Sequence, residues 1–236
     1  MTLRLVSATL ITMSLAVAQQ APPDKSNLGL AGDRFAPLTW DTMTPAQRAM
    51  TEHLLSGPRR GLGGPFNVLL RSPQMGDLAQ EFGASMRFLT SFSPKLRELA
   101  IITTARYWTS QYEWRAHRQA AVQAGLAEPI IQAIAAGKRP TQLDADETAV
   151  YNFVSELLTT KQVSDATFAT AKKTLGEPGV VDLIGLMGWY QMVSMLLNVD
   201  RYPLANGVVP ELKPPAIREI GVSLGNNLAA RVHLSV

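Results

Sequence analysis

The chain has 236 residues, 46% of them hydrophobic, so it can bury a substantial core in one or two domains. The net charge is only +3, and lysines and arginines are scattered instead of forming a basic stripe with aromatics, which argues against nucleic-acid binding. The absence of cysteine excludes disulfides, thiolate metal sites and thiol redox chemistry. Since the chain has only three histidines, a histidine-rich metal site is not expected.

Residues 1–18 have the pattern of a signal peptide. Arg4 gives a thin positive region, Leu5 to Leu15 are moderately apolar, and Ala16-Val17-Ala18 fits the small-x-small cleavage rule. The apolar run is too short to span a bilayer comfortably. We therefore predict a mature N-terminus at Gln19 and a periplasmic or secreted protein, with an N-terminal helix or an uncleaved anchor as the alternative.

The remaining chain divides by composition into three parts. Residues 19–43 contain proline and glycine without periodicity and predict an extended arm, followed by a helical domain over 44–200 and a tail over 201–236. Thr44-Pro45-Ala46-Gln47 carries the cap, proline and glutamine that begin a helix. The glycine-rich loop over 56–67 lacks the GK[ST] ending of a phosphate loop, so it predicts a turn-rich cover and no nucleotide site.

Helical periodicity continues through the domain. Ser72-Pro73 begins a helix towards Ser91, with Leu78, Phe82, Met86 and Leu89 at the spacing of a core face. Caps and glycines predict further helices over 93–108, 110–124, 129–136 and 144–159, and another from 164.

The longest apolar segment is Gly179 to Val199. It contains Asp182, glycines and Asn198, so it predicts a buried core or interface helix and no membrane span in the mature chain. Asn198 near its end is interpreted as a C-terminal cap. No segment shows sustained period-two alternation, so the predicted fold is all-α. The tail contains four prolines and cannot be one helix; it docks either on its own subunit or on a neighbour.

The segment SQYEWRAH, over 110–117, raises the question of chemistry. Glu113 and His117 are four residues apart and stack on one helix face, with Ser110 one turn before. A carboxylate can fix the tautomer of an imidazole and raise its pKa. The face is either a solvated stripe or part of an active site. Trp114 and Tyr112 are interpreted as packing or as a pocket wall.

The string RELAIITTARYWTSQYEWRAHRQAAVQAGL, over 97–126, resembles the carboxymuconolactone decarboxylase family, the relatives of alkylhydroperoxidase D. The resemblance covers roughly 66–202, and YEWxxH after an RELAI helix is typical of the decarboxylase-like branch. In the peroxidase branch, the positions of Ser110 and Glu113 are the cysteines of a CxxC motif, His117 is shared, and the relay glutamate falls on Glu98. Without thiols, peroxide reduction by dithiol exchange is excluded.

The resemblance implies an alkylhydroperoxidase D-like helical bundle that assembles as a homo-oligomer, a trimer or a hexamer. It also implies decarboxylation, or a related proton transfer, on a small carboxylated lactone or similar acid, without a cofactor or a metal. We predict His117 as the acid, Glu113 as its orienting partner and Glu98 as a second proton carrier. The predicted substrate-binding residues are Ser110, Tyr112, Trp114, Arg118 and Arg71.

Several alternatives stay open from the sequence. Glu98 is either partly buried beside Leu99 to Ile102 or a solvent-facing glutamate of a first helical turn. Arg115 and Arg118 flank the histidine and either capture a carboxylate or lie on a solvated face, and Arg59, Arg60 and Arg71 compete for the carboxylate. His53 is a weaker pocket candidate. The protein as a whole could also be a non-catalytic periplasmic small-molecule-binding or scaffold protein on the same fold.

Overall fold

The computed structural model describes residues 25–59 and 61–214, and within these residues the secondary structure is helical, without a strand. The all-α prediction is therefore confirmed, whereas the predicted signal peptide over 1–18 lies outside the described residues. A short 3-10 helix, η1 (Trp40–Thr42), precedes the α-helices. These are α1 (Pro45–Ser56), α2 (Phe66–Leu69), α3 (Pro73–Phe88), α4 (Pro94–Trp108), α5 (Gln111–Gln123), α6 (Glu128–Ala135), α7 (Ala145–Thr160) and α8 (Asp165–Asp200).

The helix ends follow the capping residues of the sequence. Thr44 and Gln47 form the predicted capping box at the start of α1, and Asp144 and Glu147 form another at the start of α7. Each box satisfies two backbone N–H groups that the first helical turn leaves free. Gly125 and Gly137 follow α5 and α6 in the left-handed conformation, with φ of 88° and 69°, which glycine adopts without steric cost.

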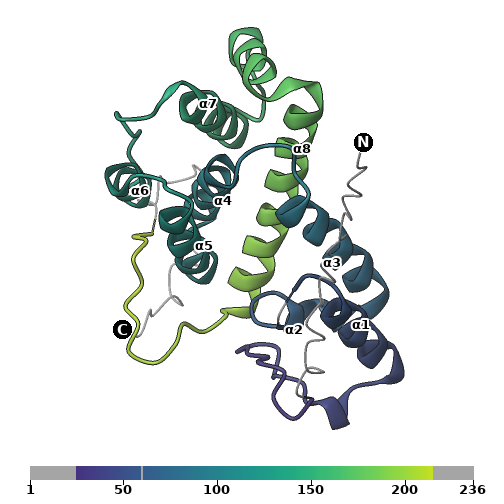
Figure 1. Cartoon of the computed structure of the whole chain (residues 1–236). Helices are drawn as coiled ribbons and strands as arrows, with labels where there is room; N and C mark the ends of the chain where they lie inside the picture. The colour runs from purple at the N-terminus through teal and green to yellow at the C-terminus, as the bar shows by residue number, and fades with distance from the viewer. Residues whose placement is uncertain (1–24, 60, 215–236) are drawn as a thin grey trace, which may run out of the picture.

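Helix α4 is the centre of the fold. It packs against α5, α7, α8 and α6, and Figure 1 shows it between α8 on one side and the other three on the other. Every residue from Glu98 to Ala105 is buried. A helix that is covered all round must be apolar on nearly every side, which the sequence LAIITTA satisfies.

Helix α8 contains the predicted Gly179–Val199 helix. Two helical segments join at Gly176, whose φ of 71° and ψ of 171° are not helical, and Pro178 follows the kink. Among the described helices, α8 alone is long and apolar enough to cross a bilayer by length and composition, and half of its most apolar window is buried inside the fold. Its buried side chains, among them Leu183, Leu186 and Trp189, pack as those of a core helix do.

The predicted core face of α3 is wrong. Leu78 and Leu89 are 72% and 77% exposed, Phe82 is 46% exposed, and Met86 is only half-buried. The buried positions are Gly76, Gln80 and Gly83. Small residues let the α3 backbone approach its neighbours closely, so the buried face is the one with little side-chain volume, which a hydrophobic pattern does not mark.

Two buried polar side chains hold the segment before η1 on the domain. Asp200 at the end of α8 accepts hydrogen bonds from the backbone N–H groups of Asp33 and Phe35, at 3.2 and 2.8 Å. Asn67 of α2 donates to the carbonyl of Phe35 at 2.7 Å and accepts from the N–H of Leu38 at 3.2 Å. This part of the predicted arm is therefore fixed by backbone hydrogen bonds.

Residues 201–214 dock on α5 of the same chain. The side chain of Gln111 donates to the carbonyl of Leu212 at 2.7 Å and accepts from its N–H at 3.1 Å, and Leu212 itself is buried. The rest of the tail lies outside the described residues. Asn198, interpreted above as a cap, donates to the carbonyl of Trp108 at 2.8 Å, so it caps the end of α4 and not of its own helix.

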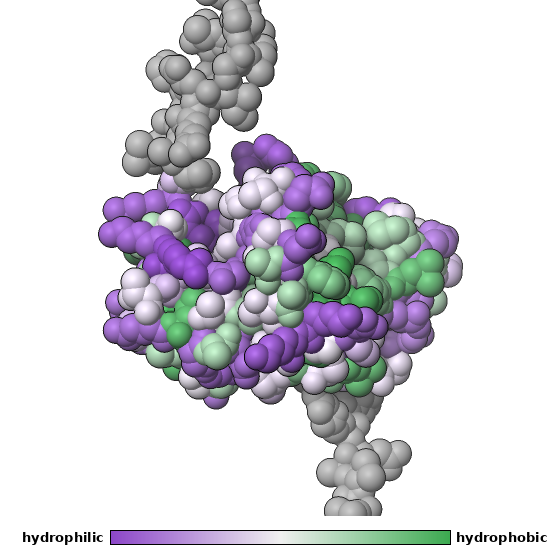
Figure 2. Space-filling model, turned by 90° about the horizontal axis from the view of Figure 1, so that it is seen from above, coloured by the Kyte–Doolittle hydropathy of each residue, from purple (hydrophilic) through white to green (hydrophobic). Residues whose placement is uncertain are grey.

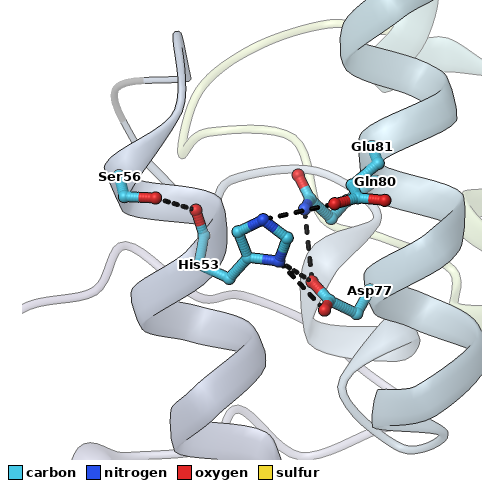
Figure 3. Close-up of polar contacts among 5 residues, drawn as sticks. All are labelled: His53, Ser56, Asp77, Gln80 and Glu81. Atoms are coloured by element: carbon cyan, nitrogen blue, oxygen red, sulfur yellow. Dashed lines mark hydrogen bonds and ion pairs between the residues drawn. The ribbon is translucent and has the colours of Figure 1, made fainter.

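A surface cluster joins α1 to α3. In Figure 3, His53 points from α1 towards Asp77 and Glu81 of α3, with 2.9 Å between Nδ1 and Asp77 Oδ1 and 3.3 Å between Nε2 and Glu81 Oε1. The hydrogen bond to Asp77 and its charge raise the pKa of His53 above the ordinary value. His53 thus contributes an exposed contact between helices, and exposed ion pairs add little to stability.

The close approach of α3 and α8 can be tested at two glycines. A Cβ on Gly83 would lie 2.3 Å from the Trp189 ring, whereas one on Gly188 of α8 would meet nothing within 4 Å. We predict that Gly83→Ala lowers the free energy of unfolding by about 1–3 kcal/mol through overpacking. Gly188→Ala, the control, should raise it by about 0.5–1 kcal/mol because alanine favours the helix. Urea denaturation measures both, and an unchanged midpoint for Gly83→Ala would contradict the packing.

Candidate active site

The side-by-side packing of α4 and α5 brings Glu98 to His117. The two helices are joined at Thr109, a left-handed C-cap with φ of 51°, and Ser110, so that α5 turns back along α4. His117 Nδ1 lies 2.6 Å from Glu98 Oε2. The two residues are 3% and 5% exposed, so of the two positions open to Glu98 from the sequence, the buried one is observed.

Glu113 occupies the other side of the imidazole. Its Oε1 lies 3.0 Å from His117 Nε2, the contact expected for residues four apart on one helix, and Glu113 is itself buried. His117 is therefore held between two buried carboxylates, one at each ring nitrogen. Buried charges are stable only when paired in this way.

Arg87 and Tyr190 complete the surroundings of His117, and sequence reasoning missed both. Arg87 Nη1, from the last turn of α3, lies 3.1 Å from His117 Nε2 and 3.3 Å from the Tyr190 hydroxyl. The Tyr190 ring of α8 meets the imidazole edge-on, with 4.8 Å between ring centroids. The only signals in the sequence are a lone arginine in a largely apolar stretch of α3 and a hydroxyl within an apolar helix.

A cavity of about 210 Å³ opens beside His117. This is well above the ~10–15 Å³ that a cavity needs to hold one water, so the space suits a small molecule. The lining includes Ala116, which is solvent-exposed, so the cavity reaches the surface beside α5. Its polar and aromatic lining consists of Arg59, Phe66, Arg87, Tyr112, Glu113, Trp189 and Tyr190, beside His117.

Arg59 lines this cavity and has no carboxylate partner within residues 25–59 and 61–214. Its guanidinium lies 5.0 Å from the ring centroid of Phe66 and 5.8 Å from that of Trp189. Its Nε and Nη2 are buried, and no acceptor within residues 25–59 and 61–214 bonds to them. Burial lowers the pKa of Arg59, and the nearby Arg87 lowers it further. An anion in the cavity would satisfy both nitrogens.

The surroundings of the site raise the pKa of both His117 and Tyr112. Burial lowers the pKa of His117, but the charge and hydrogen bond of Glu113 and the hydrogen bond of Glu98 outweigh it, so the net direction is upward. Burial, reinforced by Tyr202, raises the pKa of Tyr112 to about 12. The raised pKa of His117 enlarges the protonated fraction of the imidazole, the form that can donate a proton, and Tyr112 keeps its hydroxyl proton at neutral pH.

Of the predicted substrate-binding residues, only Tyr112 lines the cavity. Ser110 is fully buried in an extended conformation before α5 and lines a different pocket with Trp108 and Leu197, so it does not share the face of Glu113 and His117. Trp114 is buried on another side of α5 and donates to Glu211 Oε2 at 3.0 Å.

The two arginines predicted for the substrate have protein partners elsewhere. Arg118 pairs with Glu128 and with Glu211, at 3.2 Å between Nε and Oε2 of the latter. Arg71 donates to the carbonyl of Ala36. The structure therefore places neither beside His117. Arg60 lies outside the described residues.

Residues 73–156, from α3 to α7, match the family model of the carboxymuconolactone decarboxylase family. The resemblance stated from the sequence is confirmed for this segment, which contains Arg87, Glu98, Glu113 and His117. Arg59 and Tyr190 fall outside the matched segment. No curated protein matches the chain.

The two-carboxylate arrangement predicts how His117 titrates. Because Glu113 contributes most to raising its pKa, Glu113→Gln should move the midpoint of His117 to lower pH, and Glu98→Gln should do so less. NMR titration of the imidazole resonances measures this, with the His117 signal assigned by its loss in His117→Gln. Unchanged midpoints in both variants would contradict the geometry. Glu156→Gln, on the surface of α7, is the control.

Proposed function

We propose that the chain is a cofactor-independent decarboxylase, or a related proton-transfer enzyme, acting on a small carboxylated lactone or similar organic acid. The observation that carries the proposal is the buried His117, held by Glu98 and Glu113, at the wall of a small cavity. The cavity is also lined by Arg59, two of whose nitrogens have no acceptor within residues 25–59 and 61–214. The family domain over residues 73–156 supports the reaction class.

Arg59 is proposed to hold an anionic group of the substrate. Its two buried, unpartnered nitrogens are arranged as donors, and a guanidinium can bind a carboxylate with two hydrogen bonds. The Trp189 and Phe66 rings beside it offer an apolar surface to the carbon skeleton. This role belongs to Arg59 in place of Arg118 and Arg71, because those side chains already have partners.

The reaction needs a proton donor and a place for negative charge. As the carbon–carbon bond to the carboxylate breaks, carbon dioxide leaves and the electron pair passes into the conjugated carbonyl as a dienolate. The Tyr190 hydroxyl and the Arg87 guanidinium lie on the cavity wall, where their hydrogens can stabilise the oxyanion. His117 then donates its Nε2 proton to carbon and regains one from solvent, while Glu98 keeps the Nδ1–H in place.

The proposal is tested by a ligand screen followed by turnover. Thermal-shift screening against lactones and aromatic acids comes first, and carbon dioxide release from any bound compound comes second. His117→Gln should keep the fold and the binding but lower the rate by about 10²–10⁴-fold, because it removes the proton donor. The rate should also fall as pH rises through the elevated pKa of His117, since the protonated form acts.

The control for His117→Gln is Arg115→Gln, an exposed residue of the same helix. It should leave the rate unchanged. Full activity in His117→Gln would exclude the catalytic role. Binding without turnover of any bound compound would favour the alternative, a periplasmic small-molecule-binding protein.

We also propose that the chain assembles as a homo-oligomer. The misassigned face of α3, with Leu78, Phe82 and Leu89, and the outer positions Val181 and Ile184 of α8 leave large hydrophobic side chains exposed. In the view of Figure 2, hydrophobic side chains gather on one side of the surface. Exposed apolar patches of this kind mark interaction sites. The resemblance to the family favours a trimer or a hexamer.

Static light scattering at micromolar concentration should therefore give the mass of a trimer or a hexamer. Leu78→Glu should dissociate it, whereas Gln119→Glu, at an exposed position on α5, should not. A monomer mass for the unaltered protein would refute the assembly.

A further inference from the structure

His117 Nε2 has two neighbours that make opposite demands on it. Glu113 Oε1, at 3.0 Å, can form a hydrogen bond only if Nε2 carries a proton. Arg87 Nη1, at 3.1 Å, is a donor and can form one only if Nε2 presents its lone pair. Since one ring nitrogen cannot do both, the two contacts correspond to two protonation states of the same imidazole.

The other groups facing His117 do not resolve this conflict. Glu98 holds Nδ1 in both states, because a proton on Nδ1 is present in the imidazolium and in the neutral tautomer that accepts from Arg87. Tyr190 presents its ring edge-on, and its hydroxyl accepts from the same Arg87 nitrogen. Whether Nε2 carries a proton therefore depends on the position of the Arg87 guanidinium.

The charges around the cavity connect this choice to a ligand. With His117 neutral, the two arginines, Arg59 and Arg87, balance the two carboxylates, Glu98 and Glu113. With His117 protonated, one positive charge is in excess, which suits a bound monoanion. In a buried site, where charges interact strongly, binding a monoanion and taking up a proton favour one another.

We propose that Arg87 is a positioning residue that sets the protonation of His117: an organic monoanion in the cavity draws the guanidinium away from Nε2, and His117 takes a proton from solvent. His117 then faces the ligand as the imidazolium, with Glu113 as its partner. Substrate binding would in this way create the acid that the reaction uses. The inference rests on the proposed function only for the nature of the ligand.

The test measures His117 directly, without turnover. NMR titration of the imidazole is carried out on the wild type, Arg87→Gln and Arg87→Lys, each with and without benzoate as the probe. Removing the adjacent positive charge in Arg87→Gln should move the ligand-free midpoint of His117 to higher pH. Arg87→Lys keeps the charge and should stay near the wild type. A structural role alone would not produce this pattern.

Benzoate should raise the His117 midpoint in the wild type and raise it less in Arg87→Gln. Calorimetry in buffers of different ionisation enthalpy should show net proton uptake on binding to the wild type. Arg87→Gln should also weaken benzoate about tenfold, the effect of losing one charge-assisted hydrogen bond. Arg59→Gln is the contrast: it should weaken benzoate as well but raise the ligand-free midpoint less than Arg87→Gln does, because Arg59 does not contact the imidazole.

An unchanged or lowered midpoint in Arg87→Gln would overturn the role of Arg87. If benzoate saturates the wild type without raising the midpoint of His117, the proposed linkage between ligand binding and protonation is overturned. This measurement needs only the wild type, so it tests the linkage even if Arg87→Gln does not fold. If benzoate does not bind at all, the ligand class given under the proposed function fails together with the linkage. The ligand-free titrations still decide the role of Arg87 in that case.

Discussion

The contact between Glu98 and His117 is the interaction on which the rest of the site depends. It joins α4 to α5, and both side chains have to be buried, since an exposed carboxylate and imidazole would gain little from one another. Burial of Glu98 in turn requires α4 to be covered on all sides, which α5, α6, α7 and α8 accomplish. The position of the imidazole therefore depends on the central position of α4 in the fold.

This constraint explains the number of charged groups in so small a space. The imidazole between the two carboxylates also has the Arg87 guanidinium beside it, and Arg87 donates a hydrogen bond to the Tyr190 hydroxyl, so the polar groups form one connected network. Arg59 differs because its buried nitrogens have no protein acceptor in the described part of the chain. Both ring nitrogens of His117 thus have protein partners, whereas two nitrogens of Arg59 at the cavity have no acceptor within residues 25–59 and 61–214. A ligand with acceptor atoms would therefore bind beside Arg59.

A feature could be predicted from the sequence when it depends only on residues close together in the chain. The pairing of Glu113 with His117 is a property of one helix turn, and the caps at Thr44 and Asp144 are properties of four residues, so both could be predicted. Glu98 was reached through the family resemblance, because its distance from His117 depends on how two helices pack.

Other features could not be predicted because they, too, depend on how distant parts of the chain pack together. Arg87 and Tyr190 come from helices far apart in the chain and meet His117 only in the folded structure. Ser110 was placed on the wrong side because the residue before a helix adopts an extended conformation and leaves the helical face. The core face of α3 was misread because close packing at Gly76 and Gly83 leaves no hydrophobic pattern.

The docking of residues 201–214 on α5 has a consequence for the order in which the molecule is completed. Glu211 bonds to Trp114 and Arg118, and Leu212 bonds to Gln111, so the side of α5 opposite the cavity is closed by residues almost a hundred positions later in the chain. During synthesis, which proceeds from the N-terminus, α4 and α5 leave the ribosome long before this cover exists. The helix that bears His117 therefore reaches its final surroundings only after Glu211 and Leu212 have been synthesised and have docked, so the cluster of Glu98, Glu113 and His117 matures later than the helices that carry it.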